Sequence, residues 1–74
     1  MNDNLTTAAW RLKAAIKARQ LSYRKLEQMT GFPRSALHRY ATGGSRIPLE
    51  RIRPIAAALD VSPAWLAGLT PENK

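Results

Sequence analysis

Four hydrogen-bonding side chains on one side of a short segment are the residues most suited to chemistry in this sequence. They are Arg34, Ser35, His38 and Arg39. The first and third, and the second and fourth, are four residues apart, which places all four on one face of a helix. Leu37 and Tyr40 point to the opposite face. We therefore expect a helix from Pro33 to Thr42 with one apolar face and one face of hydrogen-bond donors.

Basic residues dominate the region around this segment. The chain has 12 Lys and Arg against 5 Asp and Glu, a formal net charge of +7. Only two acids, Glu27 and Glu50, lie between Arg11 and Arg53. Such an excess attracts polyanions, and nucleic acid and an anionic membrane surface are the natural partners.

The ionisable residues do not assemble into an enzyme site. The chain has one histidine, five scattered acids and no cysteine. These residues provide no nucleophile with a base and an orienting group, no metal cluster and no disulfide. A glycine-rich phosphate loop is also missing. We expect no catalysis, no cofactor and no small-molecule ligand.

The length and the apolar runs predict one small soluble domain. At 74 residues the chain makes one domain at most. We expect that domain over residues 1–69 and a flexible tail over residues 70–74. No apolar run approaches the roughly 20 residues that cross a bilayer, and the start of the chain lacks the pattern of an export signal. The expected compartment is the cytoplasm.

Apolar periodicity predicts two helices before the donor-bearing segment. The first runs from about Thr7 to Arg19, and its apolar stripe is Leu5, Ala9, Leu12 and Ile16. The side of this helix that we expect to face solvent carries Arg11, Lys13 and Lys17. Ser22 is suited to cap a second helix over Tyr23–Met29, in which Leu26 and Met29 face inward.

Turn signals divide the rest of the chain. Gly31 supplies the left-handed backbone for a tight turn into the donor-bearing helix. A fourth helix is expected over Leu49–Leu59, with a start distorted but not broken by Pro54. Ser62, followed by a proline, opens a last short helix through Leu66. These elements predict an all-α fold.

The order of these segments resembles the lambda-repressor and Cro type (XRE-like) of helix-turn-helix DNA-binding domain. Three stretches carry the resemblance, namely LSYRKLEQMTGFPRSALHRYATG, IAAALDVS and PAWLAGL. The resemblance implies a compact five-helix bundle in which the second and third helices form the helix-turn-helix. The third helix would enter the major groove of double-stranded DNA. It also implies a transcription regulator of a phage or bacterium, acting in the cytoplasm of a bacterial host.

The resemblance gives roles to individual residues. It assigns base reading to Arg34, Ser35, His38 and Arg39, and phosphate binding to Ser22, Tyr23, Arg24, Ser45 and Arg46. Arg34 can donate two hydrogen bonds to O6 and N7 of a guanine. Whether His38 and Arg39 reach bases or phosphates depends on the tilt of the helix. Glu27 departs from the usual pattern, and we expect it to reach solvent or to pair with a basic residue such as Arg24 or Arg39.

The resemblance further implies a homodimer on a pseudo-palindromic operator. The candidate dimer contacts are Trp65, Leu66 and Leu69. Two alternatives stay open: a protein-interaction module such as an antitoxin-like partner with the same fold, and a cationic peptide at a membrane surface. The stripe of the first helix is rich in alanine rather than large apolar residues, which disfavours the membrane reading. A complete Cro-sized protein and the amino-terminal domain of a longer regulator both agree with the sequence.

Overall fold

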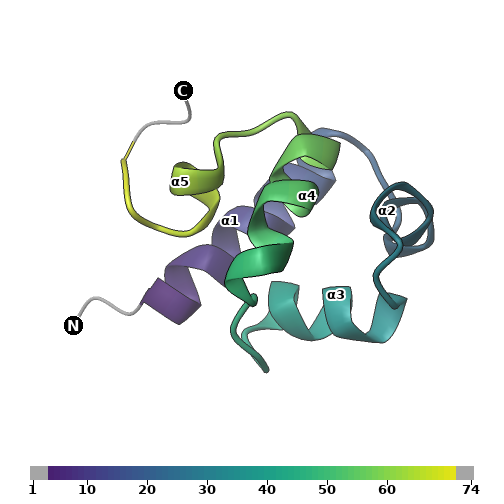
Figure 1. Cartoon of the computed structure of the whole chain (residues 1–74), viewed down its shortest axis with the longest axis horizontal. Coiled ribbons are helices and arrows are strands. Elements are labelled where there is room, and N and C mark those ends of the chain that lie inside the picture. The colour runs from purple at the N-terminus through teal and green to yellow at the C-terminus, as the bar shows by residue number, and fades with distance from the viewer. Residues whose placement is uncertain (1–3, 72–74) are drawn as a thin grey trace.

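Five helices follow one another along the chain in the computed structural model, which describes residues 4–71 (Figure 1). They are α1 (Asn4–Ala18), α2 (Tyr23–Thr30), α3 (Arg34–Thr42), α4 (Leu49–Leu59) and α5 (Pro63–Leu66). The described residues include no strand. The all-α fold with five helices is therefore confirmed. Residues 72–74 of the expected tail lie outside the described residues.

Capping groups set the ends of two of the shorter helices. At the start of α2 the Ser22 hydroxyl oxygen accepts a hydrogen bond from the backbone N–H of Lys25 at 3.0 Å. Gly31 ends α2 with a φ of 81°, a conformation that costs glycine little. At the start of α5 the Ser62 hydroxyl oxygen accepts from the N–H of Trp65 at 3.3 Å. These caps are the ones that the sequence predicts.

Helix α1 differs from its predicted range at both ends. It begins at Asn4 rather than Thr7, and the apolar stripe in the sequence already includes Leu5. A threonine costs about 0.7 kcal/mol or less inside a helix, so the threonines there do not mark a boundary. At the other end the helix stops at Ala18, because Gln20 adopts a left-handed backbone with a φ of 55°.

Helix α4 spans the predicted residues, Leu49–Leu59. The helix continues through Pro54, which lies at an exposed position. Proline removes one backbone donor and does not interrupt the helix here. Asp60 ends the helix with a φ of 57°.

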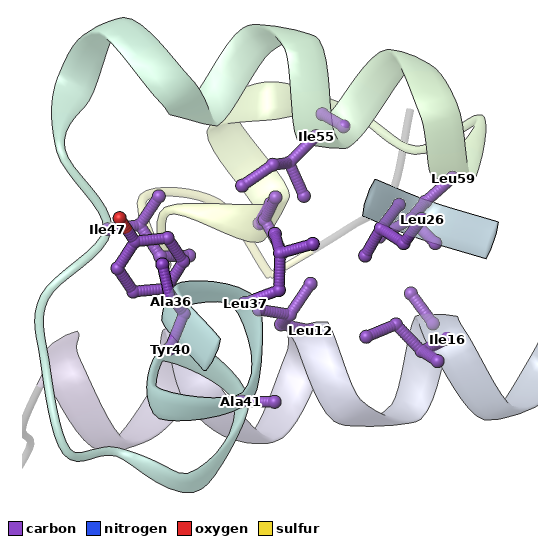
Figure 2. Close-up of a cluster of buried hydrophobic side chains, with 13 residues drawn as sticks. Leu12, Ile16, Leu26, Ala36, Leu37, Tyr40, Ala41, Ile47, Ile55 and Leu59 are labelled. Carbon is purple, nitrogen blue, oxygen red and sulfur yellow. The ribbon is translucent and has the colours of Figure 1, made fainter. Parts of the chain in front are cut away.

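The core lies where all five helices meet. Its fully buried side chains are Leu12, Leu26, Leu37, Ile55, Leu59 and Leu66. Figure 2 shows Leu37 of α3 lying between Leu12 of α1 and Ile55 of α4. Among the described residues no polar or charged side chain is buried. The charged side chains that the structure describes are therefore exposed or half-buried.

Helix α3 forms one edge of the molecule. In Figure 1 it runs along the lower edge, with α2 near its amino-terminal end and the loop to α4 at its other end. It packs against α1 and α2, while α5 packs against α1 and α4.

The sequence predicted that both Leu26 and Met29 of α2 face inward. Leu26 is buried, but Met29 is 47% exposed. Within the described chain no helix has the length and apolarity to cross a membrane.

Candidate nucleic-acid interface

The outward face of α3 gathers the four predicted base-reading residues. The exposed residues of this face are Arg34, Ser35, His38 and Arg39. The buried residues of the same helix are Ala36, Leu37, Tyr40 and Ala41. The helical period separates the two sets, so the apolar side anchors the helix while the donor side is open to a partner.

The amino-terminal end of α2 lies beside this face. The ring of Tyr23 meets the ring of His38 edge to face, with 5.3 Å between centroids and 71° between planes. Arg24, the next residue, is exposed. The first N–H groups of a helix have no carbonyl partner within it, and the positive end of the helix dipole lies there. This end of α2 is therefore suited to an anion next to the donor face of α3.

The loop after α3 carries the remaining two predicted phosphate ligands. Gly43 ends α3 with a φ of 85°, and Gly44 donates its N–H to the carbonyl of Arg39 at 2.8 Å. Arg46 then lies exposed, and Ser45 is half-buried. The loop thus places a cation beyond the carboxyl end of α3, at the opposite end from Arg34.

Glu27 pairs with a basic residue, which was one of the two expectations, but that residue is Arg34 and not Arg24 or Arg39. One of the Glu27 carboxylate oxygens lies 3.0 Å from Nε of Arg34, and the two side chains form an ion pair. The second carboxylate oxygen accepts from the backbone N–H of Arg34 at 3.4 Å. Pro33, at the N-cap of α3, provides no side-chain cap, so Glu27 fills that role. Because 58% of the Arg34 side chain and 36% of the Glu27 side chain are exposed, the ion pair contributes about 1 kcal/mol or less to stability.

Arg51 of α4 holds the turn and α3 together, a role that the sequence did not suggest. Its guanidinium carbon lies 4.5 Å from the centroid of the Phe32 ring. Its Nη1 donates to the Tyr40 hydroxyl at 3.2 Å. A buried tyrosine hydroxyl needs a polar partner, and this need was the one available signal. Which of the many basic residues satisfies it depends on how α4 crosses α3.

The sequence predicted Arg11 on a solvated face of the first helix. In the structure its side chain instead binds the carboxyl-terminal part of the fold. Its Nη1 donates to the carbonyls of Trp65 and Thr70, both at 2.6 Å. Its guanidinium carbon lies 5.1 Å from the centroid of the Trp65 ring. Thr70 is therefore held against α1, although the sequence placed it in a loose tail.

The three candidate dimer contacts have different environments. Leu66 is fully buried in the core, so it cannot contact another molecule, and that part of the prediction is wrong. Trp65 is half-buried beneath Arg11. Leu69 is 71% exposed and lines a groove of about 590 Å³. The groove is lined by Ala8, Arg46, Ile47, Pro48, Leu49, Ile52, Ala67 and Leu69.

The arrangement is suited to binding a polyanion. Within residues 4–71 no group of histidines and acids could hold a metal ion. The donor face of α3, the start of α2 and the loop after α3 together offer exposed cations and free donors, the elements that bind nucleic-acid phosphates and base edges.

Comparison with protein families agrees with this geometry. The model of the helix-turn-helix family HTH_3 matches residues 12–66, which run from the core of α1 to the end of α5. No curated protein and no solved structure matches the chain. The family match covers well over half of the chain and includes both helices of the motif, α2 and α3. The chain therefore belongs to the lambda-repressor-like (XRE-type) helix-turn-helix family, and it is a DNA-binding regulator.

Proposed function

We propose that the protein is a repressor of the phage or prophage Cro/C1 type that reads a pseudo-palindromic operator in bacterial DNA. The observation that carries this proposal is the exposed donor face of α3, with the amino-terminal end of α2 beside it. In this motif the recognition helix lies in the major groove and the preceding helix crosses the DNA backbone.

Arg34 is the leading base-reading residue in this proposal. It is the first residue of α3, and the amino-terminal residues of a recognition helix are the ones that contact base edges. A bidentate contact with guanine contributes about 1 to 3 kcal/mol of discrimination. Ser35 and Arg39 are the further readers. The ring contact between His38 and Tyr23 draws His38 toward α2, which supports a phosphate contact for this histidine.

Phosphate contacts set the register of the protein on the duplex. On one side of the DNA major groove, the proposed phosphate ligands are Ser22, Tyr23 and Arg24 at the start of α2. On the other side of the major groove they are the loop residues Ser45 and Arg46. Both groups lie at the surface or are half-buried. Such contacts position the protein without reading sequence.

The groove beside Leu69 supports homodimerisation. Leu49 and Leu69 are 84% and 71% exposed, and both line the groove. Exposed apolar surface of this kind marks interaction sites. Two-fold dimers of this motif read half-sites about one helical turn apart, so a second copy of the chain is the partner that we propose for the groove.

The same groove favours one alternative, an antitoxin-like module that binds a different protein. The number of chains on the operator separates the two. Analytical ultracentrifugation of the protein with a selected duplex should give two chains per duplex. One chain per duplex, unchanged at high protein concentration, would favour the alternative.

Selection from a pool of random duplexes tests the proposed function. The selected duplex and a scrambled duplex of the same composition are then compared at several salt concentrations. We expect the selected duplex to bind at least about 1,000-fold more tightly. Both affinities should fall with salt, because phosphate contacts release counterions. Equal affinity for the two duplexes would refute sequence-specific recognition.

A further inference from the structure

We propose that Glu27 is a specificity-determining residue of the reading face, because it positions the side chain of Arg34. This inference rests on the proposed function, in which Arg34 reads a base. Glu27 itself need not touch DNA. It would act by fixing which nitrogens of the Arg34 guanidinium are free.

The geometry of the pair supports this role. Glu27 binds Nε of Arg34 through one carboxylate oxygen, at 3.0 Å. It receives the Arg34 backbone N–H at the other, at 3.4 Å. One carboxylate therefore contacts Arg34 at two points, the backbone N–H and the Nε atom at the far end of its aliphatic stem. The two terminal nitrogens, Nη1 and Nη2, stay available as a planar fork for O6 and N7 of a guanine.

The neighbouring contact between α2 and α3 follows the same pattern. Tyr23 and Glu27 are four residues apart on α2, and Arg34 and His38 are four residues apart on α3. Tyr23 meets His38 while Glu27 meets Arg34, so one stripe of α2 faces one stripe of α3. The outward stripe of α2 thus orients two of the four donors of the reading face.

The negative charge of Glu27 also affects DNA binding directly, in addition to positioning Arg34. Between residues 11 and 53 the only acids are Glu27 and Glu50, so a carboxylate beside the reading face opposes the general attraction to phosphate. Without it, Arg34 is free to swing to the nearest phosphate, which every DNA sequence offers. Glu27 is therefore expected to lower affinity for DNA in general and to raise the preference for the operator.

The variant Glu27→Gln separates these effects. It removes the charge and keeps an oxygen that can accept the Arg34 N–H, so the cap of α3 is retained. The control is Glu50→Gln, which changes the net charge equally at an exposed position in the first turn of α4. Affinities are measured for the selected duplex, for a duplex with one base pair changed at the Arg34 position, and for a scrambled duplex. Thermal unfolding of each variant verifies the fold.

We expect Glu27→Gln to bind scrambled DNA more tightly and to lose about five- to tenfold of its discrimination at the changed base pair. The salt dependence should steepen by about one unit, as Arg34 gains a phosphate. Glu50→Gln should keep the discrimination. In an Arg34→Ala background, Glu27→Gln should change the discrimination no further.

Unchanged discrimination in Glu27→Gln, or a uniform loss of affinity and thermal stability with the same preference, would overturn the inference. The proposed function fails separately. If the wild-type protein shows no preference, or if Arg34→Ala leaves the preference intact, then Arg34 does not read a base and both proposals fall. If the wild-type preference depends on Arg34 but not on Glu27, only the inference falls.

Discussion

Two surfaces of this small domain contrast in chemistry although they share one core. The donor face of α3 carries only polar and cationic exposed residues, of which Arg34 and Arg39 are charged. The groove beside Leu69 is mainly apolar, and Leu49 and Leu69, which line it, are strongly exposed. We proposed that the first surface recognises DNA and that the second binds another copy of the chain, and the contrast supports that division. Arg46 is exposed in the loop that follows α3 and also lines the groove.

The largest expected effect comes from removing the core that supports both surfaces. Leu37 is fully buried on the inner side of α3. Leu37→Ala should lower the free energy of unfolding by about 2 to 5 kcal/mol, because it leaves a cavity. The control is Met29→Ala, at a position that is 47% exposed and outside the groove, with an expected change of about 0.5 kcal/mol or less. Urea denaturation measures both, and equal losses would contradict the described core.

A change in the groove should break assembly and spare recognition. Leu69→Ser removes an exposed apolar side chain from the groove wall. The affinity for a complete operator should fall by about 100-fold, because the two half-sites are no longer bound together. The affinity for a single half-site should not change. Met29→Ser, a control at an exposed apolar position on α2, should keep full affinity for the operator. An unaltered operator affinity in Leu69→Ser would rule out this groove as the dimer contact.

A change at Arg51 tests how firmly α3 must be held. Arg51→Ala removes both the ring contact with Phe32 and the hydrogen bond to the Tyr40 hydroxyl. We expect a loss of about 1 to 2 kcal/mol in unfolding free energy and weaker binding to every duplex. Arg51→Lys should recover little, since lysine lacks the planar guanidinium. Full stability in Arg51→Ala, measured by thermal denaturation, would show that the contact is dispensable.

The smallest expected effect comes from the loop that follows α3. Arg46→Ala should weaken binding to selected and scrambled duplexes alike and flatten the salt dependence by about one unit. Arg19→Ala is the control, because Arg19 pairs with Asp60 at the carboxyl end of α4, away from α3 in Figure 1. A loss confined to the selected duplex would make Arg46 a base reader instead of a phosphate ligand.

Local signals explain why the helices could be predicted so well. Ser22, Gly31 and Ser62 act within a few residues of their own position, and the range of α4 followed from apolar periodicity. The start of α1 was predicted three residues too late, because Thr7 is by residue type a suitable helix cap. The division of α3 into a buried and an exposed face also followed directly from the helical period.

Contacts between helices could not be predicted in the same way. The pairing of Glu27 with Arg34, and the contacts of Arg11 and Arg51, depend on how the helices cross. In a chain with 12 basic residues, composition offers too many partners for each acid and each aromatic ring. Candidate binding residues were therefore recognisable by type and face, while the residues that position them were not.

Selection of random duplexes with the wild-type protein and with Arg34→Ala in parallel tests the central claim, that the outward face of α3 reads bases. Arg19→Ala serves as the control that removes an equal charge elsewhere. The account predicts that Arg19→Ala selects the wild-type motif, whereas Arg34→Ala loses the preference at one base pair in each half-site and keeps the rest. An unchanged motif from Arg34→Ala would contradict the account.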